Sequence, residues 1–301
     1  MSRAVQVIEV GPRDGLQNEK QPLSTEFKLG LIQRLEACGF PEVEVTSMVH
    51  TKWVPQLADA ADLLERLQPL PHPGQRTVLV PNIKGLERAV ASGAKRVAVF
   101  IAASESFSQK NTNRSIEESL EQTESVIKKA LESGLTVRGY LSTVFVCPFE
   151  GDIEAATAAH LTKRLLAMGC DQVSLGDTIG AAVPEDIDNL MSELEGVSPD
   201  QLALHLHDTY GTALANVTRG LDRGIRAFDS SVGGAGGCPY APGATGNLAT
   251  EDLLYMLDRG GWQHGIDREK VVQAAHYLEQ GLGRNASSHL MAVHRSTVTT
   301  P

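Results

Sequence analysis

The chain has 301 residues, of which 42% are hydrophobic and 21% charged, and its formal net charge is −10 at pH 7. This composition is typical of a folded globular protein, and the negative charge argues against nucleic acid and anionic membranes as partners, because both need clustered positive charge. No apolar run approaches the ~18 residues of a membrane span, and four scattered cysteines exclude a disulfide-rich scaffold and a zinc ribbon.

Eight strand-like apolar runs follow one another along the chain. The first begins at Val5, which leaves no room for a signal peptide, so the expected compartment is the cytoplasm. The runs cover residues 5–10, 43–47, 77–80, 96–101, 136–142, 171–176, 202–205 and 226–230. The clearest amphipathic helices are expected between them, over residues 25–38, 115–133, 154–168, 184–194 and 212–222. Ser115 and Glu118 fit a capping box at the start of one of these helices.

Five helical stretches end in a small residue and a glycine just before the next strand. The glycines are Gly39, Gly93, Gly134, Gly169 and Gly224, where a helix C-terminus favours a left-handed residue. Strict alternation of strand and helix predicts a parallel sheet, and eight units favour a closed α/β barrel, the (β/α)8 TIM barrel. We expect a single catalytic domain over residues 1–301, with residues 260–301 as a short C-terminal helical extension whose polar end frays.

Nearly every expected strand ends in polar residues, although packing alone does not predict this. In a barrel of this kind the loops after the strands carry the chemistry. The polar positions are Arg13, Asp14 and Gln17 after the first strand, Glu44 in the second, Arg138 and Tyr140 in the fifth, Asp177 in the sixth, His205, His207 and Asp208 at the seventh, and Cys238 and Asn247 after the eighth. No glycine-rich dinucleotide fingerprint and no P-loop accompanies them.

His205 and His207 lie two apart in a strand, so both imidazoles face the same side and can chelate a metal ion. The spacing alone is equally compatible with a structural use. With Asp14 and an amide such as Asn247 the pair forms a mixed nitrogen and oxygen set, which suits Mg²⁺ or Mn²⁺ better than zinc. Asp208 either orients a ligand imidazole or caps the next helix.

Arg13 and Glu44 form a second candidate pair. Arg13 beside Asp14 is either a surface ion pair or a fixed donor to a developing oxyanion, held in place by Glu44. The second alternative gives Glu44, a carboxylate inside an apolar run, the partner that a buried charge needs.

Cys238 differs from the other cysteines because it lies in a glycine-rich segment that cannot build a core. Such a segment at the loop face is either a plain connection or a mobile lid whose thiol acts as nucleophile or acid. The other three cysteines are expected to pack as small apolar residues: Cys38, Cys147 and Cys170.

Four motifs closely resemble the hydroxymethylglutaryl-CoA lyase family, whose superfamily consists of metal-dependent barrels that act next to a thioester enolate. They are G-P-R-D-G-L-Q-N-E from Gly11, S-L-G-D-T-I-G from Ser174, H-L-H-D-T-Y-G-T-A-L-A-N from His205 and G-G-A-G-G-C-P-Y-A-P-G-A-T-G-N from Gly233. The similarity runs from residue 5 to about residue 282. The resemblance implies a carbon–carbon lyase that splits (S)-3-hydroxy-3-methylglutaryl-CoA into acetyl-CoA and acetoacetate, a reaction of leucine degradation.

The resemblance also implies roles for the polar positions. The implied ligands of a divalent ion are Asp14, His205, His207 and Asn247. The implied catalytic groups are Arg13 for the enolate, Glu44 to hold that arginine, and Cys238 to deliver a proton. Asp177 and Gln17 correspond to polar pocket residues, and either Asp177 or His205 accepts the alcohol proton. Tyr140 and Asn113 are further candidate substrate contacts.

Some features leave alternatives open. Lys110, Asn111, Asn113 and Arg114 form either a contact for the CoA phosphates or pantetheine, or a solvated charged loop.

The same chemistry on a longer 3-hydroxy-3-alkylglutaryl-CoA stays possible, as does an acetyl-CoA-dependent synthase of the isopropylmalate or homocitrate type. Those synthases typically have Asn-Asp after the second histidine, where this chain has Asp208-Thr209. A binding protein on an inactive barrel is disfavoured, because every site residue is present. The expected partners are a CoA thioester and a second copy of the chain, a dimer by resemblance only.

Overall fold

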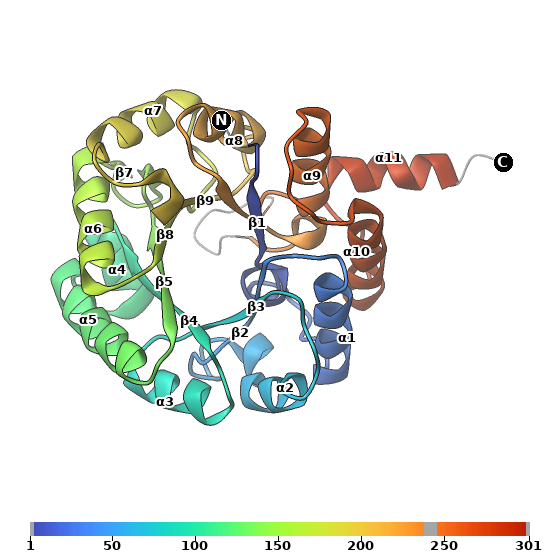
Figure 1. Ribbon diagram of the computed structural model, residues 1–301, viewed down its shortest axis with the longest axis horizontal. Helices are drawn as coiled ribbons and strands as arrows, with labels where there is room; N and C mark the ends of the chain where they lie inside the picture. Colours follow the sequence, from blue (N-terminus) through green and yellow to red (C-terminus); the bar gives the residue numbers. More distant parts are fainter. Residues whose placement is uncertain (1–2, 238–245, 299–301) are drawn as a thin grey trace.

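A computed structural model describes residues 3–237 and 246–298. At its centre lies a closed barrel of eight parallel strands in the order β1-β10-β9-β8-β5-β4-β3-β2 (Figure 1). The strands are β1 Gln6–Glu9, β2 Glu42–Ser47, β3 Gln75–Leu79, β4 Arg96–Ala102, β5 Thr136–Ser142, β8 Gln172–Asp177, β9 Leu202–Leu206 and β10 Ala227–Ser230. This arrangement confirms the predicted (β/α)8 TIM barrel.

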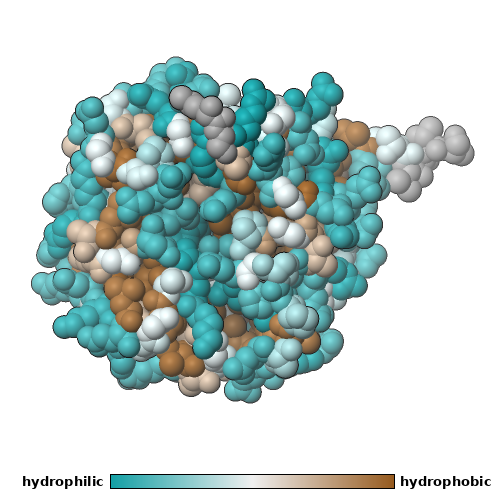
Figure 2. Space-filling view, in the orientation of Figure 1, coloured by the Kyte–Doolittle hydropathy of each residue, from teal (hydrophilic) through white to brown (hydrophobic). Residues whose placement is uncertain are grey.

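Helices surround the ring of strands (Figure 1). They are α1 Thr25–Glu36, α2 Ala60–Leu67, α3 Ile83–Ala91, α4 Glu105–Thr112, α5 Ile116–Glu132, α6 Ala155–Met168, α7 Pro184–Glu193, α8 Ala213–Asp222 and α9 Thr250–Arg259. Their apolar faces cover the outer faces of the strands, so the main hydrophobic core forms a shell between helices and barrel. The view in Figure 2 shows a mostly hydrophilic exterior with smaller apolar patches between polar side chains.

The local signals at the helix ends are confirmed. All five predicted junction glycines have a positive φ, from 75° at Gly134 to 112° at Gly169. Ser115 Oγ accepts the amide of Glu118 at 3.2 Å, and the Glu118 carboxylate accepts the amide of Ser115 at 2.8 Å. These short-range interactions fix where strands and helices alternate, and so fix which residues stand at the strand ends.

Two segments differ from the sequence prediction. Lys110 and Asn111, expected in a loop, lie in α4, whose first turn is fixed because Ser104 Oγ accepts the amide of Phe107 at 3.1 Å and Phe107 is buried. Residues 289–298, expected to fray, form α11 His289–Val298. Its first turn is fixed by the Asp252 carboxylate, which accepts the amide of Leu290 at 2.7 Å. A short hairpin, β6 Val146–Cys147 and β7 Gly151–Asp152, also lies outside the barrel.

The C-terminal extension packs against the start of the chain. Helix α10 Arg268–Leu282 lies beside α1 (Figure 1). The rings of Phe27 and Tyr277 stack at 4.2 Å between centroids, and the Arg34 guanidinium lies 3.8 Å from the Tyr277 ring centroid. Helix α11 points away from the barrel (Figure 1). Among the described residues no helix is both long and apolar enough to cross a membrane.

The interior of the barrel is strongly polar. Side chains from strands that are not neighbours meet there, including Glu44 of β2, Arg138 and Tyr140 of β5, and Asp229 of β10. All four are buried. Because a buried charge is stable only when it is paired and hydrogen-bonded, this interior holds its side chains in defined positions beneath the loop face.

Candidate active site

One turn after β1 carries two of the predicted site residues. This π-helical turn, η1 Gly11–Gly15, contains both Arg13 and Asp14. The amide of Gly11 donates to Glu9 Oε1 at 2.8 Å, and a Cβ at Gly11 would lie 2.6 Å from the same oxygen. The glycine therefore allows the close approach that turns the chain at the end of the strand.

The four predicted metal ligands lie together. Asp14, His205 and His207 each offer one ligand atom, and these atoms lie within 4.8 Å of one another. Asn247 Nδ2 donates to Asp14 Oδ2 at 2.8 Å, and residues 207 and 247 form a β-bridge. Within the described residues, the buried Nδ1 of His207 has no hydrogen-bond partner, which is unusual for a buried polar atom. This donor set fits a divalent metal ion.

Arg13 forms a buried ion pair with Glu44, not a surface one. Its Nε donates to Glu44 Oε2 at 2.7 Å and its Nη1 to Asp14 Oδ1 at 2.5 Å. The exposed fraction is 7% for the Arg13 side chain and 0% for that of Glu44. Burial opposes the charge on Arg13, but Glu44 and Asp14 outweigh it and raise the arginine pKa above its ordinary value. The guanidinium is thus a permanent cation in a fixed orientation beside the metal-ligand cluster.

Beneath these residues lies a network that sequence reasoning missed. Arg138 Nη2 donates to Asp229 Oδ1 at 2.7 Å, and its Nη1 donates to the Tyr140 hydroxyl at 2.8 Å. That hydroxyl donates in turn to Glu44 Oε2 at 3.1 Å. Asp229 also lies 3.2 Å from His205 Nδ1. The sequence does contain a signal for Asp229. Like Glu44, it is a carboxylate inside an apolar strand, and such a residue needs a partner when it is buried.

The electrostatic surroundings of the two histidines differ. Burial pushes the pKa of His205 down, but Asp229 and Asp14 outweigh it and leave the pKa raised. Burial and the neighbouring His205 lower the pKa of His207 to about 4. Burial would raise the pKa of Asp14, but Arg13 and the two histidines hold it well below its ordinary value. An ionised carboxylate next to a neutral imidazole is the protonation state that binds a cation.

A cavity of about 640 Å³ opens above this cluster. Seven of the predicted residues line it: Arg13, Asp14, Gln17, Asn113, Tyr140, His205 and His207. Lys110, Asn111 and Arg114 line it as well, so the segment predicted as a possible CoA contact forms a wall of the cavity. Trp53, whose exposed fraction is 83%, also lines the cavity. The cavity is therefore lined by cationic and apolar side chains as well as by the polar cluster.

Two acidic residues near the site have loop-fixing contacts. Asp177 Oδ1 and Oδ2 accept the amides of Ala181 and Ala182 at 3.0 and 3.1 Å. Its side chain is fully buried and is not among the residues that line the cavity, and burial raises its pKa to about 6. Asp208 Oδ1 accepts the amide of Ala213, the first residue of α8, at 3.0 Å. Of the two predicted roles for Asp208, this contact corresponds to helix capping.

Cys238 lies outside the described residues. The described part of the segment before it ends at Gly237, whose carbonyl accepts Asn18 Nδ2 at 2.7 Å. The other three cysteines are buried and free, as predicted: Cys38, Cys147 and Cys170.

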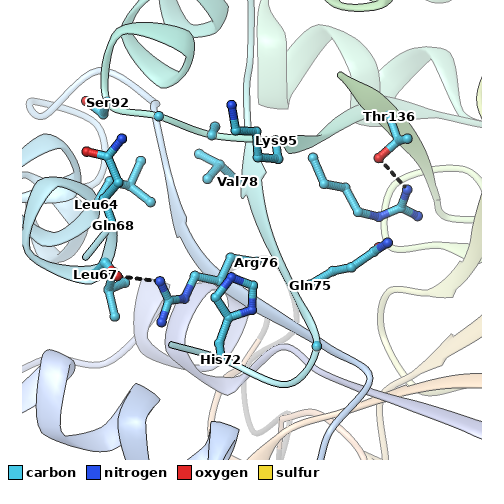
Figure 3. Close-up of a pocket in the computed structure, with 14 residues that line it drawn as sticks. Leu64, Leu67, Gln68, His72, Gln75, Arg76, Val78, Ser92, Lys95 and Thr136 are labelled. Atoms are coloured by element: carbon cyan, nitrogen blue, oxygen red, sulfur yellow. Dashed lines mark hydrogen bonds between the residues drawn. The ribbon is translucent and has the colours of Figure 1, made fainter. Parts of the chain in front are cut away.

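Figure 3 shows a second cavity, of about 430 Å³. Its lining includes the starts of several strands, so it lies at the end of the barrel opposite to the first cavity. Gln75 and Arg76, Arg96, and Thr136 of its wall stand at the starts of β3, β4 and β5. Its two arginines are paired with Glu36, Glu42 and Asp171. Because barrels of this fold carry their chemistry at the C-terminal ends of the strands, we assign the active site to the first cavity.

Comparison with known proteins gives consistent matches. The model of the HMGL-like family matches residues 4–278. A macaque protein named hydroxymethylglutaryl-CoA lyase, mitochondrial, is 49% identical over 292 residues, which cover 96% of this chain and 89% of the relative.

Solved structures agree with the sequence relatives. The hydroxymethylglutaryl-CoA lyase of Pseudomonas aeruginosa superposes with a TM-score of 0.95 at 44% identity, covering 99% of both chains. An HMG-CoA lyase of Acinetobacter baumannii, solved with coenzyme A and 3-methylmalate, superposes with a TM-score of 0.93 at 34% identity, covering 100% of this chain and 98% of the other.

Proposed function

The chain belongs to the HMGL-like family, and from this premise we propose that it is a carbon–carbon lyase that cleaves 3-hydroxy-3-methylglutaryl-CoA into acetyl-CoA and acetoacetate. The observation that carries the proposal is the convergence of Arg13, Asp14, His205 and His207 at the floor of one cavity. Among the described residues, no contact favours a condensing synthase over the lyase. The substrate is a CoA thioester, in line with the coenzyme A bound to the Acinetobacter relative.

We assign four residues to a divalent ion, Mg²⁺ or Mn²⁺: Asp14, His205, His207 and Asn247. When bound, such an ion lowers the pKa of a coordinated alcohol and stabilises developing negative charge. The sequence offers Asp177 and His205 as acceptors for the proton of the C3 hydroxyl. Asp177 has a pKa near that of a working base but turns its oxygens towards backbone amides. His205 has Nδ1 beside Asp229 and Nε2 assigned to the ion, so neither of its ring nitrogens is free to accept that proton.

After loss of that proton, the C2–C3 bond breaks and C3 becomes the ketone carbon of acetoacetate. The electron pair of the broken bond moves to C2 and so forms the enolate of acetyl-CoA. Arg13 stabilises the enolate oxygen, a contribution of ~3–4 kcal/mol on the scale of single oxyanion donors. Glu44 and Asp14 fix the guanidinium, so that it need not reorient during the reaction. We assign to Cys238 the delivery of a proton to C2, and to Gln17, Tyr140 and Asn113 contacts with the substrate.

A direct assay tests the proposal. Purified protein with Mg²⁺ and 3-hydroxy-3-methylglutaryl-CoA should release acetoacetate, and EDTA should abolish the release. A condensation product from acetyl-CoA and a 2-oxo acid, with no acetoacetate formed, would show that the lyase assignment is wrong. A series of 3-hydroxy-3-alkylglutaryl-CoA thioesters in the same assay measures the preferred branch length.

We further propose that the protein is a homodimer in the cytoplasm. Light scattering tests the oligomeric state, and cell fractionation tests the compartment.

A further inference from the structure

Asp229 lies at the centre of the polar network inside the barrel. Its carboxylate accepts three hydrogen bonds from outside the metal-ligand cluster: Arg138 Nη2 at 2.7 Å, Arg138 Nη1 at 3.2 Å and Ser174 Oγ at 2.7 Å. The side chains of Arg138 and Asp229 are both 0% exposed. A carboxylate with three fixed donors and no access to water cannot change its orientation without leaving Arg138 unpaired.

The remaining contact of Asp229 is with His205. Asp229 Oδ2 lies 3.2 Å from His205 Nδ1, while His205 Nε2 lies 3.8 Å from Asp14 Oδ2. The fully buried Arg138 guanidinium pairs directly with Asp229, and an opposite charge at this distance favours the ionised carboxylate. An ionised carboxylate only accepts hydrogen bonds, so the proton of a neutral His205 ring must sit on Nδ1. The lone pair of Nε2 then faces Asp14.

We propose that Asp229, locked by Arg138 and Ser174, is a positioning residue that fixes the tautomer and the orientation of His205 and so prepares Nε2 to bind the divalent ion. This inference rests on the metal site of the proposed function. Metal-binding histidines commonly donate their second ring nitrogen to such a carboxylate, and loss of the partner typically weakens metal affinity about 10- to 100-fold.

The two histidines are unequal in this respect. His207 Nδ1 has no partner within the described part of the chain, so no comparable contact fixes its ring. The same network also reaches Arg13, because Arg138 donates to Tyr140 and Tyr140 donates to Glu44, the carboxylate that holds Arg13. One buried guanidinium thus supports both the metal-ligand side and the oxyanion side of the site.

The test compares Asp229→Asn with a matched control, Glu42→Gln. Glu42 is also a buried carboxylate inside the barrel, and it accepts from Arg96 and Thr77 without touching any proposed ligand. Mn²⁺ affinity of each purified protein is measured by calorimetry and by electron paramagnetic resonance, well below the melting temperature. We expect Asp229→Asn to bind Mn²⁺ about 10- to 100-fold more weakly than wild type, and Glu42→Gln to stay within about twofold. Equal affinities for Asp229→Asn and wild type overturn the inference.

Two further measurements do not depend on the folding of that variant. Nitrogen-15 NMR of the wild-type protein should show His205 protonated at Nδ1, whereas an Nε2-protonated ring overturns the inference. Ser174→Ala, which removes only one donor to Asp229, should weaken Mn²⁺ binding in the same direction by a smaller factor. If wild type binds no Mn²⁺, the metal site of the proposed function fails together with the inference. If wild type binds Mn²⁺ and the variants match it, only the inference fails.

Discussion

Arg13 Nε donates to Glu44 Oε2 at 2.7 Å, and neither side chain has more than 7% of its surface exposed. This buried pair fixes the donor that the proposed reaction needs at the enolate oxygen. Lysine cannot reproduce it, because a single ammonium does not span Glu44 and Asp14 in the fork geometry of arginine. We expect Arg13→Lys to lower kcat about 100-fold, the scale of losing one oxyanion donor, with a smaller change in KM. Steady-state assays of acetoacetate release measure this.

Arg76→Lys is a matched control, because Arg76 forms a similar pair with Glu36 near the opposite end of the barrel. Its kcat should equal that of wild type. Retention of wild-type kcat by Arg13→Lys would contradict the proposed role of the guanidinium.

His207 offers a cleaner test of the metal site than the other ligands. Its ring has no hydrogen-bond partner at Nδ1 among the residues described, so its replacement breaks few structural contacts. We expect His207→Ala to lose at least about 10-fold in Mn²⁺ affinity, since one of few ligands is removed. The exposed His160 of α6 supplies the control His160→Ala, which should bind as wild type does. Undiminished metal content in His207→Ala would remove this residue from the ligand set.

Cys238→Ala should reduce turnover by orders of magnitude, because the enolate carbon would lack its proton donor. The melting temperature should hardly change, because the sequence around this residue is rich in glycine and so offers few side chains for packing. Cys170→Ala is the counterpart: Cys170 is buried and free, so its replacement should lower the melting temperature and leave turnover intact. A large loss of stability in Cys238→Ala with proportional activity would favour a packing role.

Stability should fall as the pH rises towards 8. Burial raises the pKa of Glu9 to about 7 and that of Glu251 to about 8. Because these values lie above those of the unfolded chain, the folded protein retains protons that the unfolded chain releases. The stabilisation is complete below the unfolded pKa of ~4.3 and is lost as the pH rises through the folded values. We expect the free energy of unfolding to drop by a few kcal/mol between about pH 5 and pH 8, at ~1.4 kcal/mol per pKa unit. Urea titrations at a series of pH values measure this slope.

Glu9→Gln and Glu251→Gln should each flatten that slope, because a neutral amide has no proton to lose. Glu117→Gln, at a largely exposed position, should leave it unchanged. A slope that persists in the double variant Glu9→Gln/Glu251→Gln would show that other groups govern the pH dependence.

The contact between α1 and α10 predicts a strongly destabilising substitution. A Cβ at Gly281 would overlap the ring of Phe27, which stacks on Tyr277. We expect Gly281→Ala to lower the free energy of unfolding by about 1–3 kcal/mol or more. The exposed neighbour Gln280→Ala should have little effect. In the double variant Phe27→Ala/Gly281→Ala the added methyl has room. Its loss of unfolding free energy should therefore be smaller than the sum of the losses in the two single variants.

The features that the sequence predicted are local ones. A glycine after a helix, a serine three residues before a glutamate and two histidines in alternate strand positions are short patterns with direct physical causes. A parallel barrel gathers the C-terminal ends of its strands at one face. For this reason the sequence also predicted that Asp14 and His205, which are far apart in the chain, lie close together.

The features that the sequence did not predict depend on distant contacts. Asp229 owes its position to Arg138, 91 residues away, and α11 owes its first turn to Asp252, 38 residues before Leu290. The orientation of Asp177 towards backbone amides is likewise a property of the folded loop. Periodicity and spacing carry no information on such pairs, because the partners are specified only when the tertiary structure is.

The pairing of β1 with β10 has a consequence for how the protein is made. Asp14 and Asn247 are hydrogen-bonded across 233 residues of sequence, and β10 closes the barrel against β1. A nascent chain whose last strand, β10, is still inside the ribosome therefore lacks Asn247, one of the four proposed ligands. Ion binding and ring closure are then thermodynamically linked, because a ligand that binds only the closed form stabilises it in proportion to the logarithm of its concentration. Divalent metal should accordingly favour the final step of assembly as well as the chemistry.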